Sequence, residues 1–227
     1  VWLEGVRVHP DYRRSRIATC LMEKMLEYGR KKGAVQASAI VDVTNIPSQR
    51  MVEKNGFEAI SKWAYYVTHE RPAKTKSSAR LATASDVKDI WKYLQKSEIY
   101  QLSAKRYVKS WHWYPLDRRA LSGFVMDKSV IVAGKPISGI AIINRHGYWD
   151  RKTIMQIVYL DSQSTGALKQ LVSFATNTYV DGGFEQLQIV CHDSKKLTSF
   201  IEKNMTKDEE QFLLYNKVFT AKHARSP

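Results

Sequence analysis

The chain has 227 residues and a formal net charge of +14, from 36 Lys and Arg against 22 Asp and Glu. Hydrophobic residues make up 44% of it, so a packed core is expected in one large domain or two small ones. The sequence shows no apolar run of about 18 residues and no secretory segment, which argues against a membrane protein. The basic residues are spread along the chain, so nucleic-acid binding is not indicated beyond the net charge.

The first part of the chain alternates strand and helix patterns. Residues 1–8 predict a strand, which His9 and Pro10 end. Residues 15–32 predict a helix that ends before Gly33. Its apolar stripe consists of Ile17, Leu21, Met25 and Tyr28, with Ala18 and Met22 beside it. A strand at 35–42, a helix at 45–55 and a strand at 57–68 are expected to follow.

Residues 70–78 contain no large apolar side chain and predict a linker or an exposed crossing. The pattern then starts again. After the linker we expect a strand at 79–83, a helix that Ser85 caps, an aromatic-rich helix at 103–114, a hairpin of residues 130–133 and 137–143, a strand at 154–160, a helix at 168–179, a strand at 187–191, a helix at 194–203 and a strand at 212–219.

The chain contains a diverged internal repeat. Residues 33–51 align without gaps on residues 182–200, and Ile40-Val41 then matches Ile189-Val190. The order strand, helix, strand, helix, strand therefore occurs twice.

Residues 6–18 form a candidate anion site. A strand ends at a Pro turn there, and a helix then begins in a basic segment. A helix N-terminus offers unpaired N–H groups and the positive end of its dipole, which suits a pyrophosphate. Three arginines, Arg13, Arg14 and Arg16, add positive charge. A merely solvated basic loop is the alternative.

Two motifs resemble those of the GNAT acetyltransferase superfamily. Arg13 and Ala18, preceded by Val8-x-Pro10, match motif A, [Arg/Gln]-x-x-Gly-x-[Gly/Ala] after Val-x-Pro. The segment Asn45-x-x-Ser48-x-x-Met51-Val52-Glu53-Lys54-x-Gly56-Phe57 is similar to motif B. Both occur in the family's order, and the resemblance covers about residues 1–68.

This resemblance implies an α/β (α+β mixed sheet) GNAT acyl-CoA N-acyltransferase fold, in tandem with a degenerate second copy. Residues 1–72 would be the C-terminal, acetyl-CoA-binding part of a first domain, 73–78 a linker, and 79–227 the second domain. The implied activity is direct transfer of an acetyl group from acetyl-CoA, the co-substrate, to a primary amine. The acceptor, a small molecule or a protein, is not indicated.

The resemblance also implies the site residues. The pantetheine arm would lie along the strand at Val6, Arg7 and Val8, and Asn45 with Ser48 would contact the coenzyme from the second helix. Glu4 is the candidate general base and His9 the alternative, while the N–H of Val6 or Val8 would polarise the thioester carbonyl. The residues around the pyrophosphate would be Arg13, Arg14, Ser15, Arg16, Ile17, Ala18 and Thr19.

Three departures from the family pattern bear on activity. Arg16 replaces the motif A glycine, Val52 replaces a tyrosine that protonates the leaving thiolate in many relatives, and the family's first elements do not precede residue 1. Arg16 and Val52 therefore also allow a non-catalytic acyl-CoA-binding or regulatory protein. A nucleic-acid-associated basic protein is a further alternative.

In the second copy, Gln163-x-x-Gly166-x-Leu168 is similar to motif A, but Leu168 fills the small-residue position. Ser194 and Met205 stand where motif B has Asn and Gly, so we expect a degenerate copy without a coenzyme site. Cys20 and Cys191 both lie among apolar residues, so we expect two buried thiols and a cytoplasmic location. No His or Cys spacing suggests a metal site.

Overall fold

The computed structural model describes residues 1–147, 153–203 and 207–219. It divides into two compact units, residues 1–62 with the C-terminal strand from Phe212, and residues 63–211. Strands β2 (Glu58–Thr68) and β10 (Lys207–Val218) each run from one unit into the other. The expected linker at 73–78 thus lies inside the second unit. The tandem arrangement of two copies stays a prediction.

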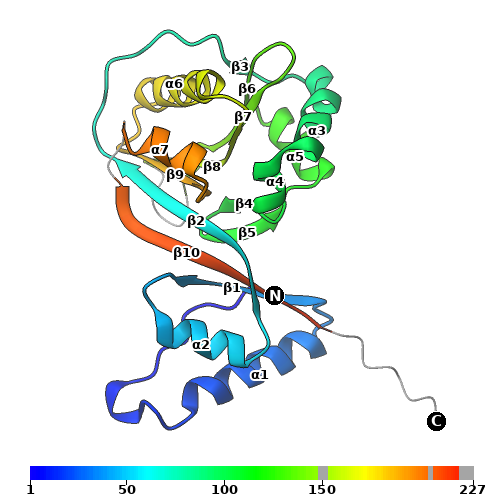
Figure 1. The fold of residues 1–227 in the computed structure, drawn as a ribbon, viewed down its shortest axis with the longest axis vertical. Helices are drawn as coiled ribbons and strands as arrows, with labels where there is room; N and C mark the ends of the chain where they lie inside the picture. The colour runs from blue at the N-terminus through cyan, green and yellow to red at the C-terminus, as the bar shows by residue number, and fades with distance from the viewer. Residues whose placement is uncertain (148–152, 204–206, 220–227) are drawn as a thin grey trace, which may run out of the picture. The chain divides into compact units, whose positions relative to one another are not determined.

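The first unit packs two helices on a small sheet, whose strand order is β1, β10, β2 (Figure 1). Strand β1 (Gln36–Asp42) pairs antiparallel with β10. Helices α1 (Ile17–Lys31) and α2 (Ile46–Lys54) confirm the two helices predicted there. The Tyr215 hydroxyl of β10 donates to Glu53 Oε1 of α2 at 2.9 Å. The core consists of Leu3, Met22, Leu26, Ala37, Ala39, Val41, Val52, Phe57 and Tyr215.

The predicted apolar stripe of α1 is wrong. Its members Ile17, Leu21 and Tyr28 expose 37%, 45% and 63% of their surface. The buried face is the neighbouring one, formed by Met22, Leu26 and Gly29. A Cβ atom on Gly29 would lie 3.1 Å from a methyl of Val1, so the glycine marks the face that packs most closely. A glycine adds nothing to an apolar pattern, which is why the sequence favoured the other stripe.

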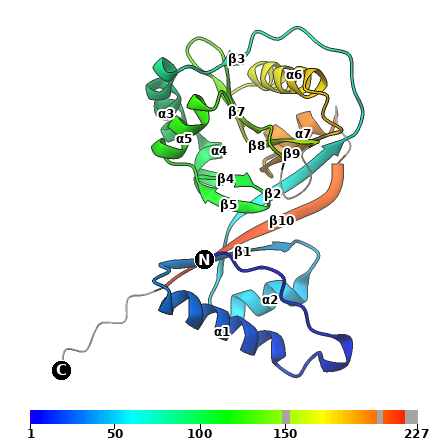
Figure 2. The ribbon, with the colours of Figure 1, turned by 180° about the vertical axis from the view of Figure 1, so that it is seen from behind.

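The second unit is a sheet with helices on both faces, in the strand order β2, β9, β8, β7, β6, β3 (Figures 1 and 2). Successive residues of its strands alternate between two cores: Ile131 belongs to the core under α6 and α7, and Val132 to the core under α3, α4 and α5. The strands are β3 (Arg80–Leu81), β6 (Val130–Ala133), β7 (Gly139–Asn144), β8 (Ile154–Ser162) and β9 (Gln186–His192), and the helices are η2 (Ala84–Asp86), α3 (Val87–Lys96), α4 (Glu98–Leu102), α5 (Arg118–Met126), α6 (Thr165–Asp181) and α7 (Lys195–Ile201).

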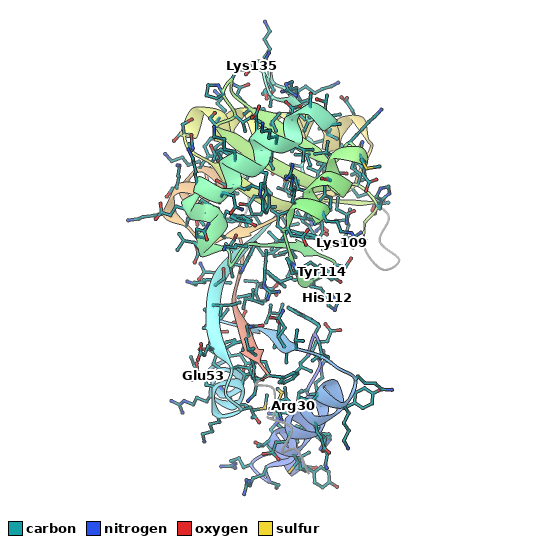
Figure 3. The ribbon with its side chains drawn as sticks, turned by 90° about the vertical axis from the view of Figure 1, so that its right-hand side faces the viewer. Arg30, Glu53, Lys109, His112, Tyr114 and Lys135 are labelled. Carbon is teal, nitrogen blue, oxygen red and sulfur yellow. The ribbon has the colours of Figure 1, made fainter. Side chains whose placement is uncertain are left out.

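The predicted helix at 103–114 is wrong. Strands β4 (Arg106–Lys109) and β5 (His112–Pro115) form an antiparallel hairpin there, at which Figure 3 labels Lys109, His112 and Tyr114. Trp113 is buried and Tyr114 is exposed, the two-residue alternation of a strand. The turn residues Ser110 and Trp111 both have positive φ without being glycine. The sequence therefore lacks the turn residues that usually indicate a hairpin.

Two further expectations need correction. The helix near Ser85 begins instead with a capping box formed by Thr83 and Asp86. Cys20 is exposed and only Cys191 is buried, because Cys20 lies on the outer side of α1.

Residues 70–78 are fixed to α6 rather than free. The backbone N–H of Thr75 donates to Asn177 Oδ1 at 3.1 Å, and Asn177 Nδ2 donates back to the Thr75 carbonyl at 2.8 Å. The Ser77 hydroxyl donates to the Gln170 carbonyl at 2.8 Å. The segment is therefore an exposed crossing that side-chain to backbone hydrogen bonds hold in place.

The stability of the second unit should depend on pH through Asp86. Arg80 donates two hydrogen bonds of 2.7 Å to Asp86 and holds the pKa of that carboxyl well below its ordinary 3.8. A lowered folded-state pKa adds stability above pH 3.8 that is lost as the pH falls further. We predict that Asp86→Asn lowers the free energy of unfolding at pH 6 and flattens its fall below pH 4, as measured by urea denaturation. An unchanged slope would contradict this.

Candidate active site

A short parallel contact joins the start of the chain to β1. The Leu3 N–H donates to the Ser38 carbonyl at 2.8 Å, and the Ser38 N–H donates to the Val1 carbonyl at 2.9 Å. Trp2 forms an isolated bridge with Ser38. Within the described residues, 4–8 form no strand pairing, so the strand predicted at 1–8 is wrong beyond the isolated bridge at Trp2. An opening is left between residues 4–8 and β1.

A pocket of about 920 Å³ lies beside this opening. It is bounded by the segment after residue 5, the following loop, and the N-terminal ends of α1 and α2. Of the predicted coenzyme residues, Ser15 belongs to the same loop but does not line the pocket. Its lining includes the other eleven: Val6, Arg7, Val8, Arg13, Arg14, Arg16, Ile17, Ala18, Thr19, Asn45 and Ser48.

The N-terminus of α1 is uncapped and faces this pocket. Its N-cap residue is Arg16, whose side chain makes no capping hydrogen bond. The first helical residues, Ile17 and Ala18, line the pocket, and their N–H groups have no intrahelical acceptor. Together with the helix dipole, this end of α1 can bind an anion.

Two arginines of the loop hold a strained backbone. Arg14 and Arg16 have φ angles of 65° and 61°, in the left-handed region that favours glycine. Within the described residues, neither guanidinium has a hydrogen-bond or ion-pair partner, and both line the pocket. The positive φ at Arg16 explains why a glycine suits this position of the motif. The arginine offers the pocket an additional cation.

The rest of the loop is braced by its own side chains. Arg13 Nε donates to the Val8 carbonyl at 3.3 Å. His9 Nδ1 lies 3.5 Å from Asp11 Oδ2 at the short helix η1 (Pro10–Tyr12). Arg13 therefore positions the loop besides lining the pocket.

Asn45 caps α2 on the opposite wall. Its Oδ1 accepts a hydrogen bond from the Ser48 N–H at 3.2 Å. The cap occupies the carbonyl oxygen, and the side-chain NH₂ has no partner among the described residues. Asn45 can therefore donate a hydrogen bond to a ligand while it begins the helix.

Glu4 lines a second, smaller cavity of about 170 Å³ at the point where residues 4–6 leave β1. Its Oε2 accepts a hydrogen bond from Trp2 Nε1 at 3.1 Å. Val52 also lines this cavity and is buried there. The alternative base, His9, lines the larger pocket beside Asp11. Glu4 thus lies nearer to the separation of the two strands than His9 does.

Sequence reasoning missed Asp42, a second carboxylate of the smaller cavity. It ends β1, in which residues 37–39 and Val41 are buried. The carboxyl end of a strand that faces a ligand cleft is a common place for a functional side chain, and that signal was present in the sequence.

The second unit lacks the corresponding opening. Its parallel strands β8 and β9 pair with each other from Ile154↔Gln186 to Ile157↔Ile189. Beyond this point β8 pairs only with β7, and β9 only with β2, among the described residues. The residues beyond this point, 158–162 and 190–191, expose 1% or less of their surface. Only Gln163 and Ser164 connect β8 to α6, and Ser164 caps that helix by accepting from the Ala167 N–H at 3.2 Å. Neither a long basic loop nor an uncapped helix end remains at this described connection.

A buried carboxylate occupies this region of the second unit. Asp161 accepts hydrogen bonds from the hydroxyls of Tyr93 and Tyr159, each at 2.9 Å, and from Ser97. Burial raises its pKa. The side chains of the unit itself fill the space that is open in the first unit.

The described residues include no group of three or more His, Cys, Asp and Glu side chains arranged to hold a metal ion. They also include no helix long and apolar enough to cross a membrane.

Comparison with known proteins finds a family likeness in the first unit. Residues 1–57 match the family model described as Acetyltransferase (GNAT) family. This part of the chain is therefore similar to the GNAT family. It contains the uncapped α1 N-terminus, the arginine loop and Asn45.

Relatives and solved structures agree with this likeness. An aminoglycoside N(6')-acetyltransferase type 1 from Acinetobacter genomosp. 13 is 32% identical over 68 residues, which are 30% of this chain and 47% of the relative. The match thus spans about half the length of that relative. A GCN5-related N-acetyltransferase from Sphaerobacter thermophilus has a TM-score of 0.64 at 12% identity, over 93% of this chain and 70% of its own.

Saccharomyces cerevisiae N-myristoyltransferase with bound myristoyl-CoA has a TM-score of 0.53 at 14% identity, over 97% of this chain and 60% of its own. These likenesses show that the chain has the GNAT fold, as its sequence predicts.

The strain at Arg16 should be measurable. We predict that Arg16→Gly is more stable than Arg16→Ala by about 1 kcal/mol, because only glycine adopts a positive φ without a steric cost. Urea denaturation of the two variants checks this. The control is the pair Ser199→Gly and Ser199→Ala at an exposed position of α7, where alanine should be the more stable. Equal stabilities of the two Arg16 variants would contradict the strain.

Proposed function

We propose that this protein is an acetyl-CoA-dependent N-acetyltransferase whose coenzyme site lies in the first unit. One observation carries the proposal: an uncapped helix N-terminus and four arginines line a pocket of about 920 Å³ beside the separation of residues 4–8 from β1. The activity of the GNAT relatives supports the reaction type.

Each wall of the pocket suits a different part of acetyl-CoA. The pyrophosphate would bind the N–H groups at the start of α1, with Arg14 and Arg16 neutralising its charge. The pantetheine arm carries amide groups, and residues 6–8 offer backbone N–H and C=O groups that have no strand partner among the described residues. Asn45 would donate its side-chain N–H to the arm from α2.

Glu4 would serve as the general base. It takes a proton from the acceptor ammonium, directly or through a water, and the neutral amine attacks the thioester carbonyl carbon. The N–H of Val6 or Val8 stabilises the negative oxygen of the tetrahedral intermediate. The intermediate collapses with cleavage of the C–S bond, the amide forms, and CoA leaves as a thiolate. Val52 cannot donate a proton, so solvent protonates the thiolate.

A non-catalytic acyl-CoA-binding protein is the second candidate, which Arg16 and Val52 favour. We place either activity in the cytoplasm, where acetyl-CoA and reduced thiols such as that of the exposed Cys20 coexist.

Charge removal from the loop should weaken coenzyme binding. We predict that Arg14→Ala with Arg16→Ala raises the dissociation constant of acetyl-CoA about tenfold or more, because each arginine makes a charge-assisted contact with phosphate. Calorimetric titration measures it. The control, Arg50→Ala with Lys88→Ala, removes two charges outside the pocket and should bind like the parent. Equal affinities of both double variants would contradict the placement.

Removal of the proposed base should affect turnover and not coenzyme binding. We predict that Glu4→Gln lowers kcat by about 100-fold or more, in the range of general base catalysis, with an unchanged dissociation constant for acetyl-CoA. Release of CoA thiol, followed over a panel of primary amines, reports the rate. A variant that keeps full kcat would exclude Glu4 as the base.

A further inference from the structure

The two adjoining cavities of the first unit carry opposite charge. The larger pocket is lined by His9 and four arginines and, among the described residues that line it, by no carboxylate. The smaller cavity is lined by Glu4 and Asp42, and its described lining contains no Lys, Arg or His. In a chain of net charge +14, a cavity with this lining favours a cation beside a site that favours an anion.

The two cavities share a wall, so ligands in them would meet. Both are lined by Val6, Asn45, Ser48 and Met51. The shared wall lies where residues 4–6 separate from β1. An acyl group that enters from the larger pocket would therefore reach the mouth of the smaller one.

The size and apolar lining of the smaller cavity limit its ligand. One water occupies about 30 Å³ of liquid, so about 170 Å³ accepts a group of a few heavy atoms. The apolar side chains of Leu3, Met22 and Val52 line it, and they suit a short alkyl chain. The cavity thus combines an apolar wall with two carboxylates at its strand ends.

Hydrogen bonds hold one carboxylate oxygen of Asp42 in place, and the other oxygen accepts none from the described residues. Its Oδ1 accepts a hydrogen bond from the Thr44 N–H at 2.7 Å and another from the Thr44 hydroxyl. Gln49 Nε2 donates to the carbonyls of Asp42 and Val43 at 3.1 and 2.9 Å and fixes the turn after β1. Oδ2 accepts no hydrogen bond from the described residues. That oxygen can accept from an ammonium.

We propose that Asp42 determines acceptor specificity by binding a small aliphatic primary ammonium in the smaller cavity, which Glu4 also lines. This rests on the proposed function, with Glu4 as the base and Asp42 as the residue that selects a cationic amine. A neutral arylamine carries no positive charge, so Asp42 would not increase its binding affinity.

Asp42→Asn is a sharp test, because asparagine keeps the Oδ1 acceptor of the Thr44 turn and removes only the charge. The matched control is Glu58→Gln, an exposed carboxylate of β2 outside both cavities. NMR titration of the ¹⁵N-labelled chain with n-propylammonium, with and without saturating CoA, measures amine binding independently of turnover. We expect the dissociation constant to rise about tenfold or more in Asp42→Asn and to stay unchanged in Glu58→Gln.

Three readouts keep this inference separate from the proposed function. Unchanged acetyl-CoA affinity in Asp42→Asn, with a fall in kcat/KM for n-propylamine relative to aniline, supports the inference. Equal n-propylammonium binding by the parent and Asp42→Asn overturns it, as does a parent that binds 1-propanol equally well. If the parent does not bind acetyl-CoA, the proposed function is contradicted. The amine titration without CoA then still tests whether Asp42 binds the amine.

Discussion

The separation of two parallel strands after a single short contact is the constraint on which the site depends. Hydrogen bonds at Ser38 hold residues 1–3 against β1, and beyond them the two segments diverge. Divergence leaves residues 5–8 without strand pairing in the part of the chain that the structure describes. Arg13 pairs with the Val8 carbonyl, and the N–H groups of this segment can bind a ligand or water. Divergence also creates room for the arginine loop and places the start of α1 at the edge of the opening. Anion binding and amine binding both follow from this geometry.

The two units show how one arrangement of elements can be open or closed. Strands β8 and β9 of the second unit also stop pairing with each other partway along, but Asp161 and its hydroxyl donors fill the space beyond. The connection from β8 to the next helix is two residues long, and Ser164 caps that helix. The same order of strand and helix therefore supports a pocket in one unit and a core in the other, and loop length together with the cap decides between them.

The sequence predicted both helices and the strands β1 and β2 of the first unit because their apolar runs and glycine stops agree with each other. The strand predicted at 1–8 is wrong beyond the bridge at Trp2. The sequence also located most residues of the pocket, since the strand–turn–helix order brings Val6, Arg16 and Asn45 together. The face of α1 was missed because Gly29 packs closely without an apolar side chain. The β4–β5 hairpin was missed because Ser110 and Trp111 adopt turn angles that neither residue favours. Asp42 was missed although it ends a predicted strand, and the folded chain shows that it lines one cavity with Glu4.

Hydrogen exchange of the full chain, with and without acetyl-CoA, tests the central claim most directly. Our account predicts that acetyl-CoA slows the exchange of backbone N–H groups in residues 6–19 and at the start of α2, because the ligand pairs with them. It predicts no change in residues 162–168 of the second unit, where Ser164 already caps the helix. Protection confined to the second unit, or none in residues 6–19, would contradict a coenzyme site at the separation of residues 4–8 from β1.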